Sequence, residues 1–417
     1  MIQGEQTLSA PSAPSWSDKL CRSVMLKIFA SLPAGQLVLK EHGVLVDVFG
    51  ERHTDLHAEI NIIDPACYRQ LLLGGSVAAG ESFAQGLWST PNLTNVIRIF
   101  ARNLDKLDAW EAKMEWLALP LRKLRHLANR NSQQGSKKNI SAHYDLGNKL
   151  YKRFLDPSMM YSAAIYPSTE ASLEQAQQHK LKVICDKLQL TEQDHLLEIG
   201  TGWGGLAIFA AQNYGCKVTT TTISEEQHNH VASLIEQLGL QQQITLLKQD
   251  YRLLEGQYDK LVSIEMIEAV GKSYLPTFFK KCSSLLKQHG LMLLQAITIN
   301  DQRLESYSKN VDFIQKHIFP GGFLPSNLLI NQHVKRYTNM MIRDLHDIGL
   351  DYATTLQHWH QRFVDSKDAL ATDGYDEHFF KMWRYYFSYC EGGFLERTIS
   401  TVQLVISKPA YYQPCLR

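Results

Sequence analysis

The sequence predicts an α/β fold built on a mainly parallel sheet with helices on both faces. Residues 195–199 form a short apolar segment that runs into a glycine-rich turn and then into a helical segment. An apolar run of this length suits a strand that is covered on both faces. Strand-like and helix-like segments then alternate as far as residue 299. This alternation favours parallel strands, because the crossover between them is usually a helix.

The chain is long enough for two domains. Its 417 residues are 44% hydrophobic and 20% charged, which is typical of a folded protein. We expect an N-terminal accessory domain with a linker over 1–135 and a second domain over 136–417. The first is predicted to be a small α+β module with strands at 36–40, 44–49 and 58–63, a helix at 68–73, a tight glycine-bearing segment ending near residue 88, and a helix at 92–107.

The second domain carries the alternating elements. We expect helix 173–188, strand 195–199, helix 203–214, strand 216–222, helix 224–239, strand 243–248, strand 258–264, helix 273–287, strand 290–299 and a last strand at 398–407. Helices expected near residues 309, 327, 352 and 375 form an insertion before the last strand and predict a cover for the substrate. In such sheets, ligands bind beyond the carboxyl ends of the strands.

Composition excludes several classes of protein. Lys and Arg number 43 against 42 for Asp and Glu, which argues against a general nucleic-acid binder. The seven cysteines are scattered and form no C-x-x-C pair, so we expect reduced cytosolic thiols, no disulfide framework and no metal site. Residues 1–16 do not resemble a signal peptide, and no apolar run reaches the roughly 18 residues of a membrane span. A cytoplasmic protein is therefore expected.

Residues 110–138 mix apolar and Trp side chains with Lys and Arg, and no acidic residue lies between Glu115 and Asp145. One interpretation is a contact with anionic lipid at a membrane surface, which would make the protein peripheral to the inner membrane surface. The other is a solvated helix face followed by a linker. Pro120 weakens the amphipathic pattern, and the sequence leaves both interpretations open.

The glycine-rich turn indicates a ligand site. Gly200, Gly202 and Gly204 permit backbone angles that a side chain would disfavour, and the following helix presents free N–H groups. Dinucleotide enzymes use similar turns, and a purely structural turn is a further alternative. The E-x-G-x-G-x-G order that begins at Glu198 resembles motif I of S-adenosylmethionine-dependent methyltransferases. At the tip of the next strand, Thr, Ser and Gln replace the acid that a dinucleotide enzyme usually carries.

Several further motifs occur in a fixed order. They are Ile140 to Asn148, Met160-Tyr161-Ser162, Thr222 to Gln227, Glu265 to Gly271, Ile318 to Gly322 and Tyr352 to Leu356. Together with the glycine turn they resemble cyclopropane-fatty-acyl-phospholipid synthases, in particular the plant-type members, over about residues 140–408. The resemblance implies a Rossmann-like class I methyltransferase sheet with a helical lid insertion, preceded by a small accessory domain that contacts lipid or a second subunit.

The resemblance also implies the chemistry. S-adenosylmethionine would donate a methyl group to the double bond of an unsaturated acyl chain in a phospholipid, aromatic rings would stabilise the resulting cation, and a bound bicarbonate would take a proton so that a cyclopropane ring closes. The corresponding site residues are Glu268, Tyr352, Ile297 through its main chain, Gln295 and Ala163. Gln295 replaces a histidine of the family and Ala163 replaces a cysteine. Without a correctly placed anion, a methyl-branched unsaturated chain would form instead of a ring.

By the same resemblance, the donor pocket comprises Tyr161, Ser162, Gly200, Gly202, Thr222, Ile223, Ser224, Gln227, Tyr251 and Ile264. From the residues alone, Ser224 is equally well explained as a helix N-cap, Tyr251 as surface packing and Glu268 as a carboxylate at a helix start. Two other functions stay open: a methyltransferase for a water-soluble acceptor, and a lipid-binding protein without catalysis. The exposed N-terminal hairpin is compatible with a homodimer.

Overall fold

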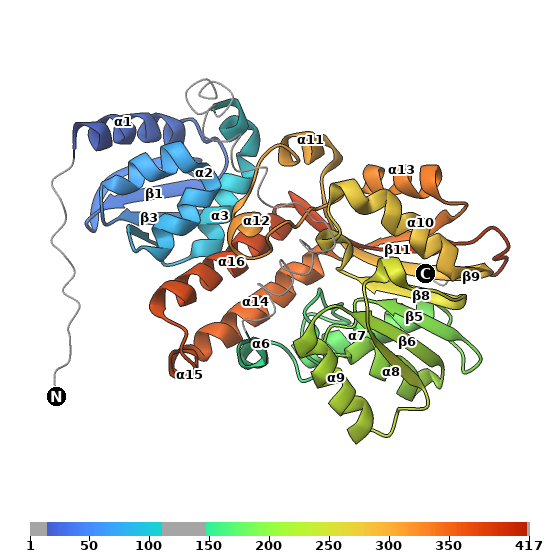
Figure 1. The fold of residues 1–417 in the computed structure, drawn as a ribbon. Coiled ribbons are helices and arrows are strands. Elements are labelled where there is room, and N and C mark those ends of the chain that lie inside the picture. Colours follow the sequence, from blue (N-terminus) through green and yellow to red (C-terminus); the bar gives the residue numbers. More distant parts are fainter. Residues whose placement is uncertain (1–14, 111–146, 415–417) are drawn as a thin grey trace. The chain divides into compact units, whose positions relative to one another are not determined.

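The computed structural model describes residues 15–110 and 147–414 (Figure 1). They form two compact units: unit 1 comprises residues 15–110 and 375–392, and unit 2 comprises residues 147–374 and 393–414. Unit 1 thus includes a stretch that the sequence-based division placed in the second domain. The predicted boundary after residue 135 and most of the basic stretch lie outside the described residues, and the roles assigned to the two domains stay predictions.

Unit 1 contains a four-stranded sheet in the order β2-β1-β3-β4. Its strands are β1 (Gln36–Glu41), β2 (Val44–Gly50), β3 (His57–Ile62) and β4 (Trp88–Ser89). The predicted hairpin and third strand are present, because β1 pairs antiparallel with β2 and parallel with β3. The accompanying helices are α1 (Trp16–Ala30), α2 (Ala66–Ala84), α3 (Leu93–Arg102) and α16 (Glu377–Leu395), most of which belongs to this unit.

Two features of unit 1 differ from the prediction. Helix α1 was not predicted; it begins with a capping box between Ser15 and Asp18. The glycine-bearing segment after residue 73 is not separate from the preceding helix, because α2 continues to Ala84 with a kink at Gly75. Gly75 has a φ of 54°, an angle that glycine adopts without steric cost, so the helix resumes beyond the kink.

Unit 2 contains a seven-stranded sheet in the order β10-β11-β9-β8-β5-β6-β7 (Figure 1). The strands are β5 (His195–Ile199), β6 (Lys217–Thr222), β7 (Ile244–Lys248), β8 (Tyr258–Ile264), β9 (Leu286–Ile299), β10 (Met341–Asp347) and β11 (Ile399–Ser407). Strands β5 to β9 are parallel, and β11 runs antiparallel to both β9 and β10. This is the predicted mixed α/β architecture, except that β10 was not predicted.

The described helices of unit 2 are α6 (Asn148–Phe154), α7 (Leu173–Lys187), α8 (Gly205–Tyr214), α9 (Glu225–Gln237), α10 (Leu275–Leu285), α11 (Leu304–Tyr307), α12 (Phe313–His317), α13 (Asn327–Tyr337), α14 (Gly349–Asp365) and α15 (Lys367–Thr372). Helices α7, α8 and α9 pack on one face of the sheet, and α10 and α13 pack on the other. The predicted alternation of strands and helices is therefore confirmed, with ends shifted by a few residues. In the part of the chain that the structure describes, no helix has both the length and the apolar character needed to cross a membrane.

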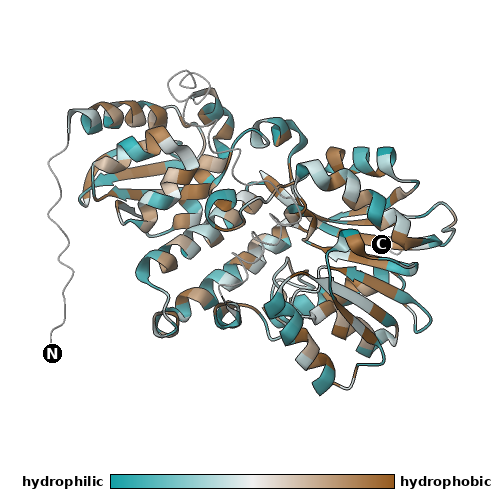
Figure 2. Ribbon diagram, viewed as in Figure 1, coloured by the Kyte–Doolittle hydropathy of each residue, from teal (hydrophilic) through white to brown (hydrophobic). Residues whose placement is uncertain are grey.

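The core lies on both sides of the sheet. Leu196 and Leu293 join one buried apolar cluster with α7, α8 and α9, whereas their neighbours Leu197 and Leu294 join the other with α10 and α13. Figure 2 shows hydrophobic residues along the strands and a mixture of hydrophobic and hydrophilic residues along the covering helices. The continuous apolar runs of β5 and β9 are thus explained, because successive side chains are buried on opposite faces.

Candidate active site

The glycine turn joins β5 to α8. Gly200, Gly202 and Gly204 have φ values of 105°, 53° and 89°, and the Gly200 amide donates to the main-chain oxygen of Thr221 on β6. A Cβ atom at Gly204 would lie 3.1 Å from Val231, whereas one at Gly202 would meet nothing within 4 Å. Gly202 therefore faces open space, where a ligand can approach the main chain.

Glu198 lies inside the strand that leads to this turn. Its side chain is buried, and the hydroxyl of Thr220 donates a hydrogen bond to it at 2.5 Å. Burial raises the pKa of Glu198 to about 8, and the hydrogen bond only partly opposes this effect. The carboxyl group is therefore neutral at pH 7 in the absence of a bound cation.

The predicted residues at the tip of β6 form a local network. The Thr222 hydroxyl donates to Gln227 Oε1 at 2.8 Å, and the Ser224 hydroxyl accepts from the Gln227 amide at 3.3 Å. Ser224 is thus the N-cap of α9, as one of the two interpretations predicted. All three side chains are buried, and Ile223 is half-buried. Their contact with a donor molecule stays a prediction.

Two more residues assigned to the donor pocket lie at the carboxyl ends of β8 and β7. Ile264 is the last residue of β8, beside β5 in the sheet. Tyr251 follows β7 in a short 3-10 helix, where its ring lies edge-on to Phe278 at 5.6 Å and the Arg252 guanidinium lies 5.7 Å from its centroid. The carboxyl ends of four parallel strands thus carry the turn, Thr222, Tyr251 and Ile264, at the edge where a ligand is expected.

The segment with Tyr161, Ser162 and Ala163 lies before α7. The Tyr161 ring has its centroid 5.3 Å from those of Tyr151 and Trp359. The Ser162 hydroxyl accepts a hydrogen bond from the ammonium of Lys180 at 2.8 Å. Burial lowers the pKa of Lys180 to about 8. Lys180 was not among the predicted site residues, because a lysine within an amphipathic helix gives no sign of being buried.

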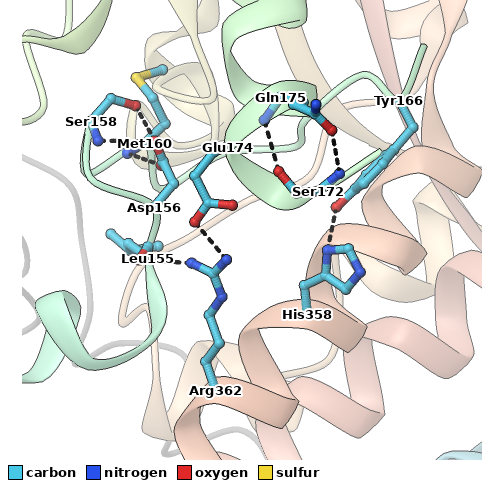
Figure 3. A network of polar contacts seen from close by, with 10 residues as sticks. All are labelled: Leu155, Asp156, Ser158, Met160, Tyr166, Ser172, Glu174, Gln175, His358 and Arg362. Carbon is cyan, nitrogen blue, oxygen red and sulfur yellow. Dashed lines mark hydrogen bonds and ion pairs between the residues drawn. The ribbon is translucent and has the colours of Figure 1, made fainter. Parts of the chain in front are cut away.

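Contacts on either side hold this segment in place (Figure 3). The Asp156 carboxylate accepts from the amides of Ser158 at 2.9 Å and Met160 at 3.1 Å. On α14, His358 Nδ1 lies 3.1 Å from the hydroxyl of Tyr166, and the Arg362 guanidinium donates to Glu174 of α7 at 2.6 Å and to the Leu155 carbonyl at 3.3 Å. Helix α14 and the segment that carries Tyr161 are therefore fixed relative to each other.

Three of the predicted catalytic residues converge on one carboxylate. It belongs to Glu265, directly after β8. Glu265 Oε1 accepts from the Ala163 amide at 2.9 Å and from Gln295 Nε2 at 2.8 Å, and Oε2 accepts from the Tyr352 hydroxyl at 3.0 Å. Burial raises the pKa of Glu265, while these hydrogen bonds and the charge of Lys180 act in the opposite direction. Sequence reasoning did not select Glu265.

The predicted Glu268 lies one turn further, in the short helix Ile267–Ala269. Its Oε1 accepts from the Ile297 amide at 2.5 Å, so both predicted residues meet, but Oε2 is buried and has no hydrogen-bond partner among the described residues. Burial and the neighbouring Glu265 carboxylate raise the pKa of Glu268 to about 8. Three of the predicted residues therefore donate to Glu265 and one donates to Glu268, which is itself the fifth predicted residue. The catalytic roles of all five stay predictions.

Aromatic rings of unit 2 adjoin this centre. Tyr352 stacks on Phe394 at 4.6 Å and meets Trp359 edge-on at 5.9 Å, and Tyr161 lies 6.2 Å from Phe319. Five further aromatic residues, Phe379, Phe380, Trp383, Tyr385 and Tyr386, lie on the part of α16 that belongs to unit 1.

The mixed sheet, the open glycine turn at its carboxyl edge and the likeness to a solved cyclopropane synthase together identify an S-adenosylmethionine-dependent methyltransferase of the Rossmann-like class I type. Residues 131–404 match the model of the mycolic acid cyclopropane synthetase family, and the chain belongs to that family. The cyclopropane-fatty-acyl-phospholipid synthase of Escherichia coli K12 is 37% identical over 363 residues, which are 84% of this chain and 88% of that one.

Other relatives support this assignment. The tuberculostearic acid methyltransferase UfaA1 of Mycobacterium tuberculosis is 36% identical over 336 residues, covering 79% of this chain and 78% of that protein. The structure of the cyclopropane synthase MmaA2 from the same organism aligns with a TM-score of 0.61 and 26% identity over 65% of this chain and 98% of that chain. The mycolic acid cyclopropane synthase CmaA1 complexed with SAH and CTAB aligns equally well, at 28% identity.

A matched pair of glycines tests the ligand turn. Gly202→Ala and Gly239→Ala both place a side chain at a positive φ, 53° and 67°, with nothing within 4 Å. Both variants should lose similar thermal stability. Only Gly202→Ala should weaken S-adenosylmethionine binding, by roughly tenfold, in isothermal titration calorimetry. Equal affinities for the two variants would place the donor elsewhere.

The buried carboxyl group of Glu198 should make stability depend on pH. Its pKa is about 8 when folded and near 4.5 when unfolded, so the unfolded state binds fewer protons between these values and stability falls as pH rises. Glu198→Gln removes this contribution. In the ligand-free protein we expect the variant to gain on the order of 3 kcal/mol relative to the unmodified protein between pH 5 and pH 8, measured by urea unfolding. A constant difference would show that Glu198 ionises normally.

Proposed function

We propose that this chain transfers a methylene group from S-adenosylmethionine to the double bond of unsaturated acyl chains in phospholipids, forming cyclopropane fatty acids. The observation that carries this proposal is the buried carboxylate centre, formed by Glu265 and Glu268, beside aromatic rings at the ligand edge of the sheet. The names of two relatives, a cyclopropane-fatty-acyl-phospholipid synthase and a mycolic acid cyclopropane synthase, support the same reaction.

When bound, S-adenosylmethionine supplies a methyl group on a sulfonium, activated enough for attack by an alkene. The main chain at Gly202 and the predicted donor residues would hold it near the carboxylate centre. Methyl transfer leaves a positive charge on the acyl chain. The negative faces of Tyr161, Tyr352 and Trp359 would stabilise this charge without reacting as nucleophiles. A base is then needed to accept a proton from the new methyl group, so that ring closure discharges the cation.

A fatty-acyl C-methyltransferase that gives methyl-branched unsaturated chains is the second candidate. One relative is named a tuberculostearic acid methyltransferase, and its identity of 36% is close to the 37% of the cyclopropane synthase. The substitutions at Ala163 and Gln295 also alter the site at which the proton would be accepted. The sequence identities to these two relatives are nearly equal, so they favour neither the cyclopropane product nor the methyl-branched product.

We also propose that the protein is cytoplasmic and acts at the inner membrane surface, either alone or as a homodimer. Unit 1 supports this, because Trp16 on α1 and Val44 and Leu45 on β2 are 78%, 69% and 58% exposed. Exposed apolar side chains of this kind favour the interface of a bilayer or an apolar contact with a second subunit. Strand β2 is also an edge of its sheet, available for pairing.

Incubation with methyl-labelled S-adenosylmethionine and vesicles of mono-unsaturated phospholipid tests the proposed reaction. Mass spectrometry and proton NMR of the released acyl chains should show one added carbon, upfield ring-methylene protons and no alkene signal. A branched chain that keeps an alkene would establish the second candidate. No label in lipid would contradict both. In that case, methyl transfer to a water-soluble acceptor would indicate a small-molecule methyltransferase. Binding to vesicles without turnover would indicate a lipid-binding protein.

A further inference from the structure

The donors that the family resemblance assigns to a bound bicarbonate are already engaged. The Ala163 amide, the Gln295 side-chain amide and the Tyr352 hydroxyl all donate to the carboxylate of Glu265, at 2.8 to 3.0 Å. The remaining assigned donor, the Ile297 amide, donates to Glu268. A separate bicarbonate would therefore have to displace Glu265 from three hydrogen bonds, so these residues do not fit the external anion.

The geometry points to a side chain of the protein that replaces bicarbonate. We propose that the carboxylate of Glu265 takes the place of bicarbonate and is itself the base of the reaction, an inference that rests on the proposed function. A C–H bond of the newly transferred methyl group breaks, and its electron pair forms the C–C bond that closes the ring. The proton passes to a carboxylate oxygen of Glu265 and leaves for solvent before the next turnover.

The backbone at Glu265 indicates a functional position. Its φ of 48° lies in the left-handed region, which side-chain-bearing residues rarely occupy. Such strain persists where the surroundings hold the residue in place, and it is concentrated at functional sites. Here the Glu265 amide donates to the Gln295 carbonyl at 2.8 Å, in addition to the three bonds to the side chain.

A second glutamine, Gln403, orients the side chain of Gln295, which is the hydrogen-bond donor on β9. Gln403 on β11 lies opposite Gln295 in the sheet and donates through Nε2 to Gln295 Oε1 at 3.0 Å. This contact occupies the amide oxygen of Gln295 and directs its Nε2 toward Glu265. Both glutamine side chains are completely buried. The pair thus forms a preorganised donor for a carboxylate at this position.

The two glutamates are suited to different protonation states. Burial raises the pKa of Glu265, whereas its three hydrogen bonds and the nearby buried ammonium of Lys180 oppose this rise and favour the ionised form. Glu268 accepts one main-chain hydrogen bond and faces the charge of Glu265, which favours the protonated form. Because two neighbouring buried carboxyl groups do not readily ionise together, Glu265 is the member available as a base.

Bicarbonate dependence tests this inference. The unmodified protein should turn over equally fast in bicarbonate-free buffer and after bicarbonate is added. Glu265→Gly removes the carboxylate, frees the three donors and relieves the positive φ. It should lose roughly 10²- to 10⁴-fold in rate and regain part of this loss with bicarbonate. Glu265→Gln fills the same space with a neutral amide, so it should be slow with or without bicarbonate.

A second readout does not depend on turnover. Bicarbonate should raise the melting temperature of Glu265→Gly and leave that of the unmodified protein unchanged. Gln189→Gly is the matched control, because Gln189 has a φ of 52° outside the site, and its activity and bicarbonate response should match the unmodified protein. If the unmodified protein makes no lipid product, the proposed function fails. If it makes product but requires bicarbonate, or if Glu265→Gln retains full rate, the assignment of Glu265 as the base is overturned.

Discussion

The active centre depends on the hydrogen bonds that converge on the carboxylate of Glu265. They connect four parts of unit 2: the segment before α7 through Ala163, the end of β8, β9 through Gln295, and α14 through Tyr352. The Tyr352 ring in turn meets Trp359. The same carboxylate therefore holds three of the five predicted catalytic residues together, and through Tyr352 it adjoins the ring of Trp359.

The sheet explains why this convergence occurs at one edge. Strands β8, β5 and β6 end side by side, so Glu265, the glycine turn and Thr222 lie at the same edge of the sheet. Strand β11 then contributes Gln403, which orients Gln295 from the adjoining strand. A methyl donor at the turn and a base at Glu265 would thus be presented to a substrate from the same edge.

Much of this arrangement was predictable from the sequence. The apolar run of β5 predicted a strand covered on both faces, and motif order led to the family. Strand β10 was missed because most of its side chains are exposed and give a weak periodic signal. Helix α1 was missed although its buried residues Met25, Ile28 and Phe29 recur at helical spacing. Glu265 was missed because a glutamate that follows a strand gives no sign, from its position in the sequence alone, of a role in the active site. Its role depends on a left-handed backbone angle and on Tyr352, 87 residues further along the chain.

A crystal structure of the protein grown with S-adenosylhomocysteine and bicarbonate is the most direct measurement of the central claim. The account predicts that the Glu265 carboxylate accepts hydrogen bonds from Ala163, Gln295 and Tyr352, with no separate anion among them. A planar anion bound to those three donors, with the Glu265 side chain turned away, would contradict it.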